Sequence, residues 1–195
     1  MDNLLKVENI KLESFPHLKE ISFDVNKSEI IGIFCKIDNG QEQIIDSICG
    51  INKIKEGKIS IVKNFYAIHH DSAIYEDLTV EENIQFTKDI YGTNANILEI
   101  LEITALTKYK NTPVGKLPIP LKKMSHFACV LSTDFELLIL EEPSMSFDDD
   151  STQKLIELSN ILKKQGKGIA IFTAKKNDLN YCDRIYYIET LEGVN

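Results

Sequence analysis

Residues Leu137–Asp148 read LLILEEPSMSFD. The four apolar residues at the start predict a short buried strand that ends at Leu140. Glu141 and Glu142 follow at once, and Pro143 then predicts a turn. Two acids at the carboxyl end of a buried strand suit a site in which the first holds the water shell of a metal ion and the second orients an attacking water. The same residues also fit a strand that ends in solvated acids, so this stretch alone leaves both interpretations open.

Apolar runs on either side of this stretch predict further strands. They are short and nearly continuous in apolar residues, which is typical of a parallel sheet covered on both faces. The predicted strands are Ile30–Cys35, Lys58–Val62, Phe65–Ile68, Gly168–Phe172 and Arg184–Ile188. Between them, apolar residues recur at helical spacing within Ile44–Ile48, Met124–Leu131 and Leu155–Leu162. Strands that alternate with helices predict an α/β fold.

One long stretch departs from this alternation. Residues 72–132 contain two predicted helices, Glu81–Tyr91 and Ala95–Leu106, and no convincing strand. A helical insertion therefore separates the strand Phe65–Ile68 from the strand that begins at Leu137. We expect a single domain over residues 1–195, with an α/β core formed by residues 1–71 and 133–195 and a helical subdomain formed by residues 72–132.

The composition of the chain excludes several classes of protein. Its 195 residues include 22 Lys and Arg against 30 Asp and Glu, for a net charge of −8, and the only arginine is Arg184. An acidic chain of this kind binds nucleic-acid phosphates poorly, so we expect no nucleic-acid partner. No run approaches the ~20 apolar residues of a membrane helix, and the first residues lack a leader pattern. We therefore expect a cytoplasmic protein.

The cysteines and histidines favour neither a disulfide framework nor a metal centre. The four cysteines are scattered without a C-x-x-C pair, at Cys35, Cys49, Cys129 and Cys182. This spacing predicts buried thiols. His69 and His70 are adjacent, and neighbouring positions on a strand face opposite sides, so we do not expect this pair to chelate one ion.

The polar loop Lys36–Gly40 is the predicted anion site. It leads from the strand Ile30–Cys35 into a helix, and free backbone N–H groups converge at such a junction in an α/β sheet. A phosphate-binding loop would read G-x-x-x-x-G-K-[ST], with the lysine on the β- and γ-phosphates and the hydroxyl on Mg²⁺. Only Gly40 matches this pattern, and Gln41, Glu42 and Gln43 follow it. By itself the loop also fits an ordinary turn.

The order of these features resembles the ATP-binding subunit of ABC transporters over essentially the whole chain. Leu5–Val25 is similar to the opening hairpin of that family, and Ile31–Gly50 is similar to its phosphate-loop strand and helix. Ser72–Ile84 resembles the entry into its helical subdomain, Leu137–Asp148 its Walker B strand and D-loop, and Asp183–Ile188 its closing strand. The resemblance implies a P-loop NTPase fold of the ABC ATPase type. In that fold a mainly parallel sheet core carries an N-terminal antiparallel β part and an inserted helical subdomain.

The departures from the family pattern fall on the positions to which the resemblance assigns chemistry. Gln41 stands at the Walker A lysine and Glu42 at the hydroxyl residue that follows it, so Gly40–Gln43 resembles a decayed phosphate loop. Glu141 stands at the Walker B metal position, and Glu142 keeps the residue type of the water-orienting catalytic position. The remaining assignments are His70 at the Q-loop glutamine, Ala174 or Lys175 at the switch histidine, Phe15 at the aromatic that stacks on adenine, and Leu117–Leu121 at the LSGGQ signature.

These departures predict a degenerate nucleotide site. Gln41 removes a positive charge from the neighbourhood of a polyanion and Glu42 adds a negative one, and each such pair amounts to about 4 kcal/mol at ~4 Å and an effective dielectric of about 20, before screening. Pro118 and Pro120 each remove an N–H from the segment at the signature position. We therefore expect ATP and Mg²⁺, the ligands that the resemblance implies, to bind weakly or not at all.

The resemblance leaves three hypotheses on function. The first is an ABC transporter subunit, of a peptide, antimicrobial or drug exporter or an immunity system, that cannot hydrolyse ATP by itself. It would couple a membrane permease to a second ATP-binding subunit, as a homodimer or heterodimer at the inner face of the cell membrane. The second is a conventional ATPase subunit in which Lys36 or Lys175 replaces the missing charge. The third is a soluble regulatory or scaffold protein that contacts its partner through the apolar segment Leu117–Leu121.

Overall fold

The computed structural model describes residues 3–36, 40–69 and 74–191. His70 and most of the predicted anion loop therefore lie outside the described residues. The chain divides into two compact units, each described by itself below. The first unit comprises Met1–His70, Phe135–Pro143 and Ser159–Asn195, and the second comprises Asp71–Asp134 and Ser144–Leu158. Residues 144–158 thus group with the helical stretch, whereas the sequence predicted them as part of the core.

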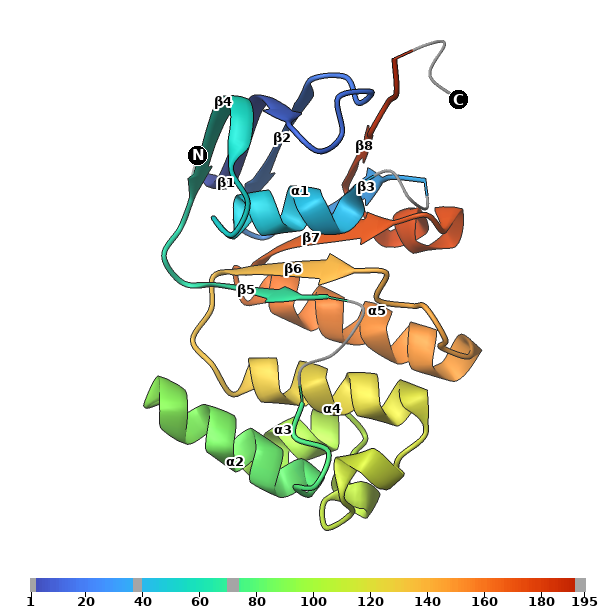
Figure 1. Ribbon diagram of the computed structural model, residues 1–195. Coiled ribbons are helices and arrows are strands. Elements are labelled where there is room, and N and C mark those ends of the chain that lie inside the picture. Colours follow the sequence, from blue (N-terminus) through green and yellow to red (C-terminus); the bar gives the residue numbers. More distant parts are fainter. Residues whose placement is uncertain (1–2, 37–39, 70–73, 192–195) are drawn as a thin grey trace. The chain divides into compact units, whose positions relative to one another are not determined.

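A five-stranded parallel sheet forms the centre of the first unit (Figure 1). Its order is β5-β6-β7-β3-β8, with bounds Phe65–Ile68, Leu137–Glu141, Gly168–Thr173, Ile30–Phe34 and Arg184–Tyr187. Every residue of β6 and β7 is buried, which explains why these strands are apolar without alternation. The predicted α/β fold with a mainly parallel sheet is confirmed.

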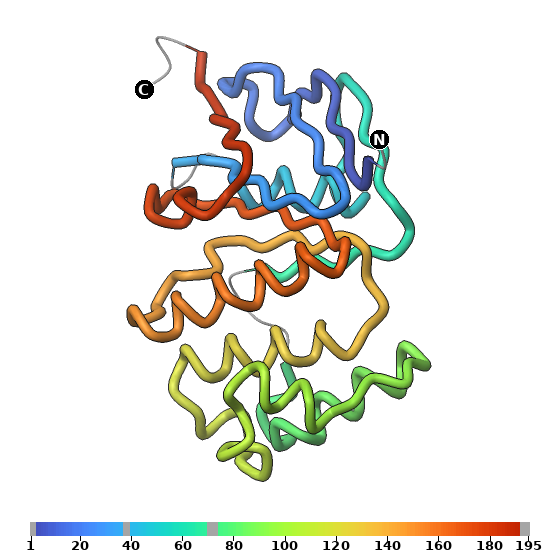
Figure 2. Tube along the Cα trace, turned by 180° about the vertical axis from the view of Figure 1, so that it is seen from behind, coloured from blue at the N-terminus to red at the C-terminus, as the bar shows by residue number. Residues whose placement is uncertain are grey.

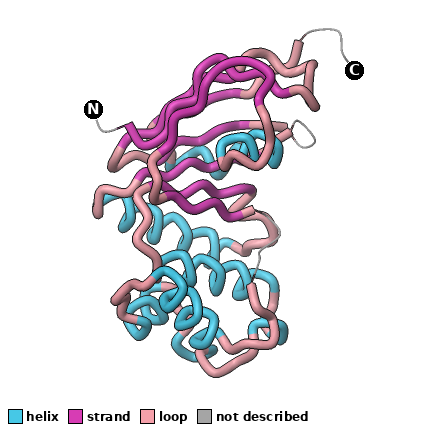
Figure 3. Tube along the Cα trace, turned by 60° about the vertical axis from the view of Figure 1, so that its left-hand side comes forward, coloured by secondary structure: helices cyan, strands magenta, loops and turns pink. Residues whose placement is uncertain are grey.

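A three-stranded antiparallel sheet makes up the rest of the first unit's β-structure (magenta in Figure 3). Its order is β2-β1-β4, with bounds Ile21–Asn26, Asn3–Leu12 and Ile54–Ile61. β4 therefore begins before the predicted strand at Lys58, because pairing with β1 extends as far as Leu12. Buried side chains of β1 and β2 join Ile33 and Phe172 of the parallel sheet in one core. Ile44, Ile45 and Ile48 of helix α1 (Gln41–Ile48) complete it.

Arg184, the only arginine of the chain, links the two sheets of this unit. Its guanidinium donates to the carboxylates of Asp24 at the end of β2 and of Glu29 just before β3, at 2.9–3.2 Å for the contacts through its terminal nitrogens. Arg184 Nη1 also donates to the Tyr186 hydroxyl at 2.7 Å. Hydrogen bonding to Arg184 lowers the pKa of Asp24 below its ordinary value. We call Arg184, Asp24 and Glu29 the arginine clamp.

The second unit is mainly helical, and Figure 2 traces its chain from green to orange. Helix α2 (Val80–Tyr91) begins at a capping box, in which Thr79 accepts from the Glu82 N–H, and ends at Gly92 in the left-handed conformation. Its helical neighbours are α3 (Ile97–Ile103), the 3-10 turns η1 (Thr107–Tyr109) and η2 (Val114–Lys116), and α4 (Ile119–Leu131). Helix α3 is shorter than the predicted Ala95–Leu106. Asn96 caps its start, and Ala105, with φ 58°, cannot continue it.

Two more elements complete the chain. Helix α5 (Asp149–Lys164) begins in the second unit and ends in the first, and η3 (Lys176–Tyr181) follows β7. Among residues 3–36, 40–69 and 74–191, no helix has the length and apolar character needed to cross a membrane.

Candidate functional site

The site predicted from the sequence lies in the first unit, where β3 ends and α1 begins. Gly40 precedes the helix in the left-handed conformation, with φ 74° and ψ 28°. The Phe15 ring packs against it, so that a Cβ at position 40 would lie 3.2 Å from the ring. Both the positive φ and the close ring require glycine here. Phe15, the candidate for stacking on adenine, thus packs against the residue that caps the start of α1.

Gln41 stands at the position of the Walker A lysine, and its side chain is buried. The amide nitrogen Nε2 donates to the Cys35 carbonyl at 2.8 Å and to Glu142 Oε1 at 3.0 Å. The first residue of α1 is therefore hydrogen-bonded to the chain just after β3 and to the chain just after β6. The glutamine amide makes bonds that a lysine ammonium could also make, but it carries no positive charge.

Donors from two places in the chain, Gln41 and the neighbouring residues Thr173 and Ala174, surround Glu142. Besides Gln41, the Ala174 N–H donates to Oε1 at 2.6 Å, and the Thr173 hydroxyl lies 3.2 Å from Oε2. Its backbone adopts φ 43°, a conformation in which a residue with a side chain is strained. A water-orienting base needs an oxygen aimed at water. Oε1 of Glu142 accepts two hydrogen bonds from the protein, and Oε2 faces the Thr173 hydroxyl.

The two residues predicted at the switch-histidine position contribute through their backbones. Ala174 supplies the N–H that Glu142 accepts. The Lys175 N–H donates to Thr173 Oγ1 at 3.0 Å, and the lysine side chain is exposed. Thr173 Oγ1 also lies 2.8 Å from a carboxylate oxygen of Asp178, which is buried. Neither Thr173 nor Asp178 was predicted as a site residue, because neither stands at a position with chemistry in the family.

The Cys35 thiol reports the electrostatic character of this place. Burial, and after it the negative charge of Glu142, raises the pKa of Cys35 to about 12. A thiolate is therefore strongly disfavoured beside Glu142.

Glu141, at the Walker B position, meets a histidine. It is buried, with 7% of its surface exposed, and its Oε2 lies 3.2 Å from His69 Nδ1. The other ring nitrogen, Nε2, lies 3.7 Å from Asp46 Oδ1 on α1. From the sequence, His69 stood out only as half of a histidine pair. Its position directly after β5, the neighbour of β6 in the sheet, was the signal that could have placed it beside Glu141.

Carboxylates gather at the end of the sheet where α1 begins. The free N–H groups at the start of α1 favour an anion, but Glu142, Glu141 and Asp46 place carboxylates around that end of the sheet and helix. Glu42, at the position of the metal-binding hydroxyl, is exposed, and so is Lys36. Within the described part of the chain, no three His, Cys, Asp or Glu side chains are arranged to hold a metal ion.

The segment at the signature position lies in the second unit, at the start of α4. Pro118 is the N-cap residue, and Pro120 lies in the first turn, where helical N–H groups have no partner within the helix. Neither proline therefore costs the helix a hydrogen bond, which explains why both are tolerated at the start of α4. Leu117 is buried, whereas Ile119 is 57% exposed. The segment thus both packs inside the unit and presents one apolar side chain outside.

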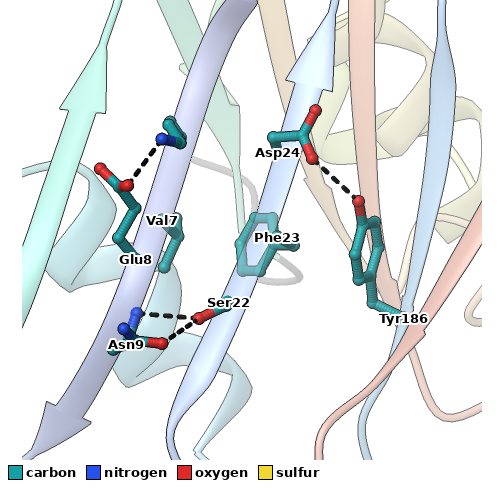
Figure 4. A pocket seen from close by; sticks show the side chains of 8 residues that line it. Val7, Glu8, Asn9, Ser22, Phe23, Asp24 and Tyr186 are labelled. Atoms are coloured by element: carbon teal, nitrogen blue, oxygen red, sulfur yellow. Dashed lines mark hydrogen bonds and ion pairs between the residues drawn. The ribbon is translucent and has the colours of Figure 1, made fainter.

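The first unit also contains a cavity of about 320 Å³ beside the arginine clamp, and neither Glu141 nor Glu142 lines it. Figure 4 shows that its polar side chains pair with one another: Glu8 with Lys6, Asn9 with Ser22, and Asp24 with Tyr186. The Asn9–Ser22 pair links β1 to β2, the Asp24–Tyr186 pair links β2 to β8, and the Lys6–Glu8 pair lies within β1. They add no reactive group to the site.

Solved structures share this architecture. The ADP conformation of MJ1267, an ATP-binding cassette of an ABC transporter, is 19% identical, covers 96% of this chain and 88% of that chain, and superposes with a TM-score of 0.81. The chain has the ABC ATPase fold. The dimeric bacterial ABC transporter cassette MJ0796 shares that ABC ATPase fold with a TM-score of 0.81, 17% identity and coverage of 98% of this chain and 100% of that chain.

Curated relatives of this ABC ATPase-fold chain are ABC transporter ATP-binding proteins. The teichoic acids export ATP-binding protein TagH of Bacillus cereus is 27% identical over 184 residues, which are 90% of this chain and 34% of TagH. The ribose import ATP-binding protein RbsA of Bacillus subtilis is 24% identical over 193 residues, which are 86% of this chain and 39% of RbsA. The chain spans little more than a third of these relatives. No protein-family model matches it.

Proposed function

We propose that this chain is an ATP-binding-type subunit of an ABC transporter whose own nucleotide site does not hydrolyse ATP. It acts as an interaction and coupling partner between a membrane permease and an active ATPase subunit, at the cytoplasmic face of the membrane. The observation that carries this proposal is the hydrogen bond from Gln41 Nε2 to Glu142 Oε1 at 3.0 Å. A neutral amide stands where the phosphates need a cation, and it is hydrogen-bonded to one oxygen of the acid that would orient water.

The comparisons support the transporter context and leave the direction of transport open. TagH is named for export and RbsA for import. We propose an exporter of peptides, antimicrobials or drugs, or an immunity system, because the segment Tyr75–Asn83 (YEDLTVEEN) resembles that of short exporter subunits. The dimeric cassette MJ0796 supports pairing with a second ATP-binding subunit, either this chain or another.

Calorimetric titration with Mg-ATP tests the nucleotide site directly. We expect a dissociation constant weaker than ~100 μM, which corresponds to about 5.5 kcal/mol. Tighter binding would favour the conventional ATPase, and the variants Lys36→Gln and Lys175→Gln would then show which lysine supplies the missing charge. An ATPase rate that Glu142→Gln does not change would argue against catalysis by this site.

The double variant Gln41→Lys with Glu42→Ser restores the charge and hydroxyl of a phosphate loop. Under the proposal it binds Mg-ATP at least tenfold more tightly than the natural chain, because a cation replaces an amide and an acid is removed. Gln41→Met with Glu42→Ser is the matched control. It removes the acid without adding the cation, so the difference between the two variants measures the lysine.

Affinity purification after co-expression with neighbouring membrane and ATP-binding subunits tests the coupling role. Association with both is the expected result. A chain that associates with neither would favour a soluble scaffold, and crosslinking from Ile119, the exposed residue of Leu117–Leu121, would then identify the partner.

A further inference from the structure

The cluster of His69, Glu141 and Asp46 is the feature of the first unit that the family pattern does not explain. His69 leaves β5 and lies between an acid at the end of β6 and an acid on α1. Its two nitrogens lie 3.2 Å from Glu141 Oε2 and 3.7 Å from Asp46 Oδ1. We call these three residues the histidine bridge.

We propose that His69 is an internal substitute for a divalent cation at Glu141, and that its ring excludes metal from this position. The inference rests on the proposed function, because a subunit that hydrolyses ATP would need a metal ion here. Beyond that function, it assigns the metal position beside Glu141 to the His69 ring, and it predicts that this one side chain is enough to exclude the metal.

The geometry supports this role. Divalent magnesium binds carboxylate oxygens at about 2.1 Å, so a cation on the side of Glu141 Oε2 that faces His69 would have to displace the hydrogen bond between this oxygen and the ring nitrogen 3.2 Å away. The ring also provides what the acid needs. A buried carboxylate is costly unless it is paired or hydrogen-bonded, and an imidazole N–H satisfies it without a metal.

The second acid explains why a histidine, and not merely any donor, suits this place. Asp46 Oδ1 faces Nε2, while the other Asp46 oxygen accepts from Asn52 Nδ2 at 3.2 Å. An imidazole has nitrogens on both sides of one rigid ring, so it can face two acids from different elements. Removal of the ring would leave Glu141 and Asp46 facing the same space, and two carboxylates in one space attract a divalent cation.

Titration with Mn²⁺ in the absence of nucleotide tests the proposal. Bound Mn²⁺ is measured from the loss of the free-ion signal in electron paramagnetic resonance. We expect His69→Ala to bind Mn²⁺ at least fivefold more tightly than the natural chain, and Glu141→Gln in the same background to abolish the gain. His69→Asn keeps a donor near Glu141 and is expected to resemble the natural chain. His17→Ala is the matched control, since His17 lies in the same unit and contacts Phe15 rather than an acid.

A gain smaller than fivefold in folded His69→Ala, or an equal gain in His17→Ala, would overturn the proposal. A second measurement needs no variant. In the natural chain, substoichiometric Mn²⁺ should broaden the ring signals of His69 no more than those of His17, and stronger broadening at His69 would show a metal bound at Glu141. The Mn²⁺ titration contains no ATP, so its outcome is independent of the Mg-ATP titration that tests the proposed function. Tight Mg-ATP binding by the natural chain would contradict the proposed function without changing the Mn²⁺ result.

Discussion

Two groups of acids in the first unit differ in what neutralises them. In the arginine clamp, Asp24 and Glu29 share the guanidinium of Arg184. At the ends of β6 and β7, Glu142 is instead held by a glutamine amide, a hydroxyl and a backbone N–H. The comparison shows that this chain places its only arginine where it joins two sheets. It holds Glu142 of the predicted nucleotide site with groups that carry no fixed charge.

The largest expected effect comes from removing the cation of the clamp. Arg184→Met leaves Asp24 and Glu29 close together without their partner, and we expect a loss of about 3 kcal/mol in the free energy of unfolding, after allowance for partial exposure. Urea denaturation measures it. Lys167→Met, which removes a cation from the same unit outside the clamp, is the comparison variant. An equal loss of unfolding free energy in both variants would show that the arginine clamp stabilises the chain no more than a single lysine does.

Glu142→Ala should have a smaller effect, because it breaks bonds to neutral donors. We expect a loss of about 2 kcal/mol, since the Gln41 amide and the Ala174 N–H each lose a hydrogen bond to Glu142, whereas the Thr173 hydroxyl keeps Asp178 as an acceptor. Glu142→Gln keeps one acceptor oxygen and should lose less. Thermal unfolding separates the two variants. Stabilisation by Glu142→Ala would mean that repulsion among the acids outweighs these hydrogen bonds.

Gln41→Leu isolates one partner of Glu142. Loss of the two hydrogen bonds of the buried amide is expected to destabilise the chain by about 1–1.5 kcal/mol. Combining it with Glu142→Ala in a double-mutant cycle should give less than the sum of the single effects, because both remove the same bond. Additive losses would contradict the contact between these side chains.

The smallest expected effect is a difference in pH dependence. Arg184 lowers the pKa of Asp24, so the stabilisation from this acid is fully present above its ordinary value of 3.8 and is lost as the pH falls through the lower folded-state value. The natural chain should therefore lose stability in this window more steeply than Arg184→Met. Unfolding free energies measured from pH 5 to pH 2.5 test this. Parallel curves would show that the clamp does not cause the slope.

The pattern of apolar residues was enough to predict most of the first unit. The strands beginning at Ile30, Phe65, Leu137, Gly168 and Arg184 all lie where continuous apolar runs predicted them. Runs of this kind are informative because a strand covered on both faces must be apolar throughout. Helix ends were harder to predict. The end of α3 depends on the local backbone at Ala105, for which the apolar period gives no signal.

The sequence by itself determined that an acidic pair ends a buried strand, that glutamine replaces the expected lysine, and that an α/β sheet carries both. Only the tertiary structure decided which groups meet these acids. Gln41 and Glu142 are separated by 101 positions, and His69 and Glu141 by 72. Residues so distant meet because parallel strands bring their carboxyl ends to one edge of the sheet. Strand order decides which of these carboxyl ends are neighbours, and no local pattern of residues encodes that order.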